Sequence, residues 1–158
     1  MTIFKRAHWL SLLVPAGLLL GAYGSQYIGG LYPCEMCWWQ RWPHFAAVPL
    51  ALLGFFVSNP MVKRVLVALA ALAILTSGVI GGFHAGVEYG WWPGLSTCST
   101  VPTGSAKEVM DAILNAPTIR CDVAPWKMFG ISLAGFNFLI STFAALVVLV
   151  IVGREKSA

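Results

Sequence analysis

Apolar residues dominate four long stretches of this chain that contain no Asp, Glu, Lys or Arg. The uncharged stretches cover residues 7–34, 42–62, 65–87 and 128–153. A helix needs about 20 mainly apolar residues to cross a bilayer, so each stretch can hold one spanning helix. The predicted spans lie near residues 9–28, 42–58, 63–83 and 131–152.

The first two predicted spans are less regular than the other two. Lys5 and Arg6 before an apolar run resemble the start of a signal peptide. The run, however, stays uncharged as far as Glu35 and ends in no clear small-residue cleavage site. The second span contains Pro43 and Pro49, which membrane helices tolerate when neighbouring groups satisfy the freed carbonyls. We therefore expect an uncleaved first span and a proline-containing second span.

The composition excludes a soluble domain. Hydrophobic residues make up 58% of the 158 residues, only 10% are charged, and the mean hydropathy is +0.78. A soluble domain carries about 25% charged residues, so this chain cannot cover a water-facing surface and lipid must be its solvent. A net charge of +4 is too small to indicate nucleic-acid binding. We expect one all-α membrane domain over residues 1–158, built as a four-transmembrane-helix bundle.

The positive charges indicate how the spans are oriented. In the four-span arrangement one side of the membrane carries Lys5, Arg6, Lys63, Arg64, Arg154 and Lys156. Because Lys and Arg gather in cytoplasmic loops, both termini are expected in the cytoplasm. The loops near 29–41 and 84–130, which hold all four cysteines, then lie outside.

The long loop 84–130 is predicted to contain a short amphipathic helix. Ser105 and Glu108 have the spacing of a capping box, in which each side chain bonds the backbone of the other. The apolar residues that follow on one helical face are Val109, Met110, Ile113 and Leu114. The sequence Asn115-Ala-Pro117 is expected to end the helix. It could lie on the membrane surface or pack on protein, and the sequence does not separate these alternatives.

Cys34, Cys37 and Arg41 form the most informative group in the sequence. A C-x-x-C pair has the spacing that lets two thiols close and reopen a disulfide. If the helix that carries these residues begins before Cys34, all three side chains share one face of it. If the helix instead begins at Cys34, the positive end of its dipole favours the thiolate form of that cysteine. Arg41 could instead extend to lipid headgroups. Beside a C-x-x-C pair we favour a guanidinium that stabilises negative charge near the sulfurs.

The other two cysteines, Cys98 and Cys121, lie in the long loop. Four cysteines permit three full pairings, and the spacing of these two encloses more than twenty residues. Such a disulfide could be a structural staple contributing about 3 kcal/mol, or an exchangeable bond. A zinc site is disfavoured because a second C-x-x-C and a histidine with ligand spacing are missing, so no metal is expected.

Three further polar residues lie in or beside the apolar stretches. His84 and Glu88 are four residues apart near the outer end of the third span, where they could pair, line a polar pocket, or simply be solvated. His44 follows Cys37 by seven residues on a similar helical face and is expected to pack on its neighbours. Trp38, Trp39 and Trp42 are typical of the aromatic belt at a membrane interface.

With these residues in place, the chain resembles the disulfide bond formation protein B (DsbB) family of bacterial inner-membrane thiol:quinone oxidoreductases. The resemblance covers nearly the whole chain. The motifs that carry it are PCEMCWWQR at residues 33–41, HAGVEYGWWPG at 84–94 ahead of Cys98, and CDVAPWKMFGISLAGFN at 121–137. It implies a protein that sits in the inner membrane, with the cysteine-bearing loops in the periplasm.

The resemblance also implies a reaction. The disulfides would be Cys34–Cys37 and Cys98–Cys121, with Cys34–Cys121 as the exchange intermediate. The partner would be a DsbA-like periplasmic oxidase with a thioredoxin fold, and the electrons would pass to ubiquinone or menaquinone. Arg41 would hold the quinone, and His84 is chosen as its contact from the third span.

Two alternatives remain at this point. A vitamin K epoxide reductase-like oxidase also combines a helical bundle, a C-x-x-C and a quinone, but its loop cysteines precede the C-x-x-C, whereas here they follow it. A non-catalytic four-span protein held by two disulfides would have cysteines inert toward a dithiol partner.

Overall fold

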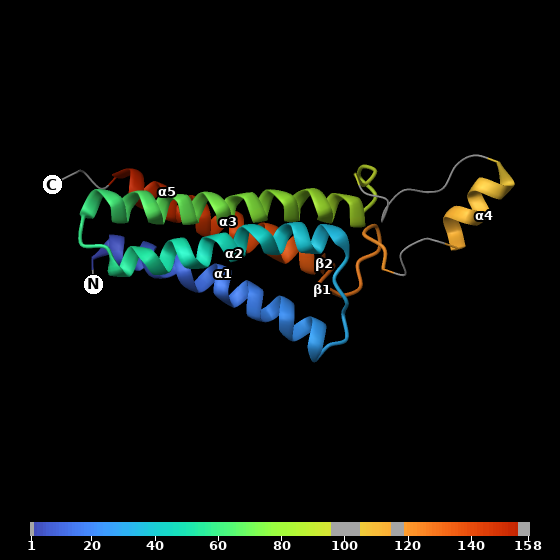
Figure 1. Cartoon of the computed structure of the whole chain (residues 1–158), viewed down its shortest axis with the longest axis horizontal. Coiled ribbons are helices and arrows are strands. Elements are labelled where there is room, and N and C mark those ends of the chain that lie inside the picture. The colour runs from blue at the N-terminus through green and yellow to red at the C-terminus, as the bar shows by residue number, and fades with distance from the viewer. Residues whose placement is uncertain (1, 96–104, 115–118, 155–158) are drawn as a thin grey trace.

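Long helices that lie side by side make up most of the chain. The computed structural model describes residues 2–95, 105–114 and 119–154. Its elements are α1 (Ile3–Tyr27), α2 (Glu35–Phe56), α3 (Pro60–Glu88), α4 (Ala106–Leu114), β1 (Lys127–Met128), β2 (Ile131–Ser132) and α5 (Leu133–Arg154). Helices α1, α2, α3 and α5 pack together, while α4 lies beyond one end of this group (Figure 1). The predictions for Cys98, Lys156 and Asn115-Ala-Pro117 fall outside the described residues.

Three of the long helices have the length and apolar character needed to cross a membrane. They are α1, α3 and α5. Helix α2 is not among them, because Gln40, Arg41 and His44 on its first three turns lower its hydropathy. The described part of the chain is therefore mostly helical, with three candidate membrane spans, and spanning by α2 stays a prediction.

The charged ends of the long helices gather at one end of the packed group. Both chain termini and the α2–α3 connection lie there, and the connection from α1 to α2 lies at the other end (Figure 1). The first turns of α1 and α3 and the last turn of α5 supply the basic residues Lys5, Arg6, Lys63, Arg64 and Arg154. This arrangement agrees with the predicted topology, although the side of the membrane stays a prediction.

Two helices are longer at the cysteine end than predicted. Helix α2 begins at Glu35, ahead of the span predicted near 42–58, and Cys34 is its N-cap, as in one of the two alternatives that the sequence left for Cys34. The Cys34 sulfur caps the helix by accepting the Cys37 N–H at 3.3 Å. Glu35 in the first turn also favours the helix start through its negative charge. Helix α3 continues to Glu88, so His84 and Glu88 lie on a helix instead of in a loop.

A small hairpin modifies the prediction that the fold is all-α. Strands β1 and β2 pair in antiparallel register just before α5. The turn between them places both Phe129 (φ 52°) and Gly130 (φ 80°) in the left-handed region, as a tight two-residue hairpin turn requires. The Tyr89 hydroxyl donates to the Gly130 carbonyl at 2.9 Å and accepts from the Ser132 N–H at 3.0 Å, which joins the hairpin to the end of α3.

The capping box of α4 is confirmed. The Ser105 N–H and hydroxyl both donate to Glu108 Oε2, at 2.8 and 2.7 Å, and the Glu108 N–H points back to the Ser105 oxygen at 3.5 Å. Met110 and Leu114, on the predicted apolar face, are exposed. Both alternatives for what this face contacts remain open.

Small residues let α3 approach α2 and α5 closely. A Cβ at Gly81 would lie 3.0 Å from the Ala134 carbonyl oxygen and the Asn137 side-chain nitrogen, and 3.1 Å from Gln40 Oε1. All three atoms belong to neighbouring helices. Glycine at this position therefore allows the polar contacts between the helices to form.

We expect Gly81→Ala to destabilise the protein by about 1–3 kcal/mol, because the added methyl group forces packed atoms apart. The matched control is Gly24→Ala, since a Cβ at Gly24 has nothing within 4 Å. Thermal unfolding of both variants in the same detergent measures the effect. Equal unfolding midpoints for the two variants would show that the contact of α3 with its neighbours accommodates a methyl group without strain.

Candidate functional site

The two cysteines of the C-x-x-C pair lie together at the start of α2. Their sulfur atoms are 2.8 Å apart, and both residues are free thiols in this structure. Cys34 is buried, whereas Cys37 is partly exposed. The helix start brings the sulfurs close enough to react with each other, and the Cys34–Cys37 disulfide itself stays a prediction.

Cys121 packs against this pair from a distant part of the chain. It is fully buried in one apolar cluster with Cys34, Met36 and Val87. Cys121 is itself part of a disulfide. Because Cys98 lies outside the described residues, its predicted pairing with Cys121 stays a prediction. The structure thus brings together three of the four cysteines that sequence reasoning selected.

Arg41 is a buried cation in a cage of α1 and α2 side chains. It is 6% exposed and donates to Gln26 Oε1 at 2.7 Å and to the Ala22 carbonyl at 3.1 Å. The rings of Tyr23 and Trp38 lie 5.0 and 4.9 Å from the guanidinium carbon. Among the described residues, no carboxylate lies within 4 Å of it. The positive charge is therefore held inside the protein, and none of the described residues supplies an anionic partner.

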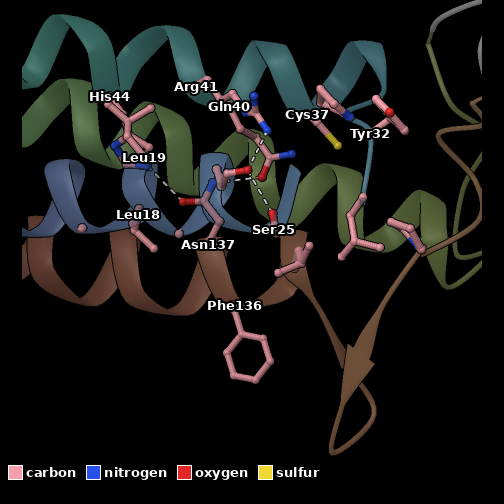
Figure 2. A pocket seen from close by; sticks show the side chains of 17 residues that line it. Leu18, Leu19, Ser25, Tyr32, Cys37, Gln40, Arg41, His44, Phe136 and Asn137 are labelled. Carbon is pink, nitrogen blue, oxygen red and sulfur yellow. Dashed lines mark hydrogen bonds between the residues drawn. The ribbon is translucent and has the colours of Figure 1, made fainter. Parts of the chain in front are cut away.

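Two cavities meet at Cys37. The first has a volume of about 230 Å³, lies between α1, α2 and α5, and is lined by Cys37, Arg41, His44 and Asn137 among others. Figure 2 shows these side chains along the cavity, with the Cys37 sulfur at one end and His44 at the other. The second, of about 340 Å³, also borders Ile119, Arg120 and Val123 and is lined by both cysteines of the pair and by His84. Cys37 is thus accessible from both sides.

His84 lies in the second cavity, apart from Arg41. It is 1% exposed, and its Nε2 lies 3.8 Å from Glu88 Oε1, so of the three alternatives for these residues the structure has them buried and close to each other. The same nitrogen lies 3.1 Å from the Cys121 carbonyl and 3.6 Å from Cys34 Sγ. Its position connects it to the cysteines, and contact with a quinone stays a prediction.

Gln40 fixes where His84 carries its proton. The side-chain nitrogen of Gln40 lies 3.2 Å from the Met36 carbonyl, which can only accept, so this nitrogen is a donor there. It also lies 2.8 Å from His84 Nδ1, which must therefore accept. The ring proton is then on Nε2, which donates to the Cys121 carbonyl and points toward Cys34.

Asn137 on α5 extends this network toward the middle of the bundle. Its amide nitrogen donates to Gln40 Oε1 at 2.9 Å and to the Ser77 carbonyl at 3.1 Å. Its oxygen therefore accepts, from His44 Nε2 at 3.1 Å and from the Ser141 hydroxyl at 2.8 Å. Polar groups of α2, α3 and α5 are joined in one buried chain that reaches the redox pair.

Sequence reasoning missed this network. It expected His44 only to pack on its neighbours. A signal was present, because Ser77, Asn137 and Ser141 are isolated polar residues in apolar helices, and such residues usually face the bundle interior and bond across helices. Which of them meet could not be read from one sequence.

The site also contains three groups that could hold a metal ion. The ligand atoms of Cys34, Cys37 and His84 all lie within 4.8 Å of one another. Spacing did not predict this group, because the histidine comes from another helix. The network places a proton on His84 Nε2, the nitrogen nearest the sulfurs, and this tautomer suits a hydrogen bond to sulfur better than metal ligation.

A hydrogen bond with Cys37 and burial raise the pKa of the Cys34 thiol above its ordinary value. Because the thiolate is the nucleophile, we expect iodoacetamide at pH 8 to label Cys37 at least about tenfold faster than Cys34 in the reduced protein. Peptide mass spectrometry measures the two rates. In Cys37→Ala, which lacks the hydrogen bond, Cys34 should react faster than in the wild type. Preferential labelling of Cys34 in the wild type would contradict this assignment.

Comparison with known proteins agrees with the geometry. The family model described as "Disulfide bond formation protein DsbB" matches residues 5–151. Disulfide bond formation protein B of Verminephrobacter eiseniae (strain EF01-2) is 30% identical over 152 residues, which cover 92% of this chain and 83% of that protein. Its counterpart in Shewanella sp. (strain MR-4) is 30% identical over 136 residues, covering 82% and 77%. An uncharacterized protein, RP370 of Rickettsia prowazekii (strain Madrid E), is 25% identical over 124 residues, covering 76% and 71%. No solved structure matches the chain.

Proposed function

This chain belongs to the DsbB family of disulfide bond formation proteins, which are protein-disulfide:quinone oxidoreductases, and we propose that it reoxidises a DsbA-like periplasmic oxidase and passes the electrons to a membrane quinone. The observation that carries this proposal is the position of the C-x-x-C pair. Cys34 packs against Cys121 on one side, and Cys37 opens into the Arg41 cavity on the other. Electrons entering at one end of the pair can leave at the other.

The first half of the reaction is thiol–disulfide exchange. A thiolate of the reduced partner attacks Cys98 of the Cys98–Cys121 disulfide, which releases Cys121 as a thiolate. Cys121 then attacks Cys34, forming the Cys34–Cys121 bond and releasing Cys37. The partner's second thiol attacks the mixed disulfide, so the partner leaves oxidised. The close packing of Cys121 and Cys34 supports the second exchange, since their side chains share one buried cluster.

The second half of the reaction takes place in the cavity beside Arg41. Cys98 first attacks Cys121 of the Cys34–Cys121 bond, which re-forms the Cys98–Cys121 disulfide and releases Cys34. The thiols of Cys34 and Cys37 then lose two electrons and two protons to quinone, which leaves the Cys34–Cys37 disulfide and quinol. For each cycle, two partner thiols lose two electrons and two protons, and one quinone gains them. The Arg41 guanidinium lines the same cavity as Cys37, and its hydrogen-bond partners Gln26 and Ala22 are neutral. It suits this step, because it can stabilise both a thiolate and negative charge developing on a quinone oxygen.

His84 has a positioning role in this scheme. Its Nε2–H lies between the Cys121 carbonyl and Cys34 Sγ, at 3.1 and 3.6 Å. A donor at this place ties the loop segment of Cys121 to α3, next to Cys34 at the start of α2, and stabilises negative charge on the Cys34 sulfur. This position favours exchange between the disulfides over direct contact with the quinone.

The proposed location is the bacterial inner membrane, with both termini cytoplasmic and the cysteines periplasmic. Three apolar helices and membership of the family support membrane insertion. The basic helix ends lie at the end of the bundle opposite the cysteine pair, which supports the orientation (Figure 1).

Purified full-length protein mixed with a reduced DsbA-type partner tests the proposal. Thiol counting should show partner oxidation that depends on added ubiquinone or menaquinone. A partner lacking its second cysteine should be trapped as a mixed disulfide with Cys98. Quinone-independent thiol loss and no trapped adduct would instead support a non-catalytic protein held by disulfides.

A further inference from the structure

His44 is a buried histidine whose second ring nitrogen has no partner among the described residues. The side chain is 3% exposed and lines the first cavity, two helical turns deeper than Cys37. Its Nε2 is hydrogen-bonded to the network, but its Nδ1 is buried without a hydrogen-bond partner. Buried polar atoms in native proteins are almost always paired. Because His44 lines the cavity, a ligand that enters it is a candidate partner for the unpaired nitrogen of this side chain.

The hydrogen bonds around His44 leave only a lone pair on Nδ1. The Asn137 oxygen near Nε2 can only accept, because the Asn137 nitrogen is committed to the Ser77 carbonyl and to Gln40. The Ser77 hydroxyl, 2.9 Å from the same Nε2, donates to the Gln40 carbonyl at 2.7 Å, so it also accepts from the ring. Nε2 therefore carries the proton, and Nδ1 can only accept a hydrogen bond.

The spacing of Cys37, Arg41 and His44 matches the dimensions of a single ring. All three follow one face of α2 along the cavity (Figure 2). Seven residues make nearly two turns, so Cys37 and His44 are separated by about 10 Å along the helix axis. A quinone is a six-membered ring with an oxygen at each of two opposite ends. The ring, its two oxygens and one hydrogen bond at each oxygen together cover a length similar to this separation. The guanidinium of Arg41 reaches back along the helix to the ring of Trp38, the residue next to Cys37, with 4.9 Å between the guanidinium carbon and the ring centre. The cavity thus has a donor, Arg41, toward the Cys37 end and an acceptor, His44, at the other.

We propose that His44 Nδ1 accepts a hydrogen bond from the distal hydroxyl of the quinol formed in this cavity, and so distinguishes the reduced ring from the oxidised one. This proposal rests on the proposed function and names a specificity-determining residue for it. Both oxygens of a quinone are carbonyls, which only accept, so the oxidised ring leaves Nδ1 unpaired. A quinol carries a hydroxyl at each end and satisfies it.

The contact has a consequence for the reaction. A site that binds the product more tightly than the substrate shifts the bound equilibrium toward that product. His44 therefore draws electrons from the thiol pair onto the ring, toward disulfide plus quinol. The same contact slows the release of quinol, so product inhibition should depend on His44.

Binding of decylubiquinone and decylubiquinol to the full-length protein in lipid nanodiscs tests the proposal. His44→Leu should weaken quinol binding up to about tenfold, the value of one hydrogen bond, and leave quinone binding within about twofold. His44→Gln retains an acceptor and should restore part of the quinol affinity. The matched control is His8→Leu, which removes another buried imidazole. Its Nε2 lies 2.8 Å from the Ala51 carbonyl, and His8 does not line the cavity.

A second measurement needs no variant, so it remains decisive if His44→Leu fails to fold. The dimethyl ether of decylubiquinol has the reduced ring but no hydroxyl hydrogen. It should bind the wild-type protein no more tightly than decylubiquinone does.

The outcomes separate this proposal from the function on which it rests. The role of His44 would be overturned if His44→Leu lost affinity for quinone and quinol equally. It would also be overturned if the dimethyl ether bound as tightly as quinol does. Either result would leave the quinone site itself intact. If the wild-type protein binds neither quinone nor quinol, both the proposed function and the proposed role of His44 fail.

Discussion

Replacement of Cys37 by serine is expected to reduce quinone-dependent turnover to background. Cys37 is the only cysteine among the described residues that lines the cavity beside Arg41, so without its sulfur the electrons have no route from the thiol pair into that cavity. Capture of the partner should persist, because in the proposed scheme it occurs at Cys98. Turnover is measured as quinol formation in the presence of reduced partner, and capture as the mixed disulfide on a non-reducing gel.

The control for Cys37→Ser is Glu35→Gln, which changes an exposed residue in the same helical turn. It should retain most of the wild-type turnover and all of the partner capture. Wild-type turnover in Cys37→Ser would show that Cys37 is dispensable and that the cavity is not the electron exit.

Replacement of Arg41 by methionine is expected to raise the KM for quinone by about tenfold to a hundredfold. The guanidinium is buried with two neutral hydrogen-bond partners and lines the cavity, so it is free to bond a negatively charged or carbonyl oxygen. A hydrogen bond from a charged group is worth about 1.5–3 kcal/mol, which corresponds to that range. Steady-state kinetics against ubiquinone concentration measure the change, and thermal unfolding checks that the protein remains folded.

Two further variants separate the charge of Arg41 from its structural contacts. Gln26→Ala removes the side-chain partner of Arg41 without touching the cavity lining, so the KM should change little. Arg41→Lys keeps the charge but replaces the planar guanidinium and its several N–H donors with a single ammonium group. Its KM for quinone should lie between those of the wild type and Arg41→Met. An unchanged quinone dependence in Arg41→Met would remove Arg41 from the site.

Local spacing predicted the features that lie within one helix. The four apolar stretches correspond to α1, α2, α3 and α5, and the capping box marked the start of α4. Cys34 and Cys37 were expected to meet because three residues span one turn, and their sulfurs are 2.8 Å apart. These predictions succeed because helix geometry fixes the distance between residues that are close in sequence.

Features that depend on two or more segments were predicted poorly. The hairpin at β1 and β2 was not expected, since its two-residue strands carry no periodic pattern. Whether His84 pairs, lines a polar pocket or is solvated was left open by the sequence, and the structure places it in the second cavity with Nε2 3.1 Å from the Cys121 carbonyl. Its contact with a quinone stays a prediction. Membership of the family, in contrast, followed from motifs that lie within short segments.

The sequence by itself determined the helices, the helix ends that carry positive charge, the reactive pair of cysteines and the family. Only the tertiary structure decided which polar groups meet, and with them the proton positions on His84 and His44. The reason is physical: the turn of a helix sets contacts between near neighbours, whereas contacts between helices depend on how closely they approach. At Gly81 the missing Cβ lets α3 approach α2 and α5 closely. This close approach leaves space for the hydrogen bond between Gln40 and Asn137.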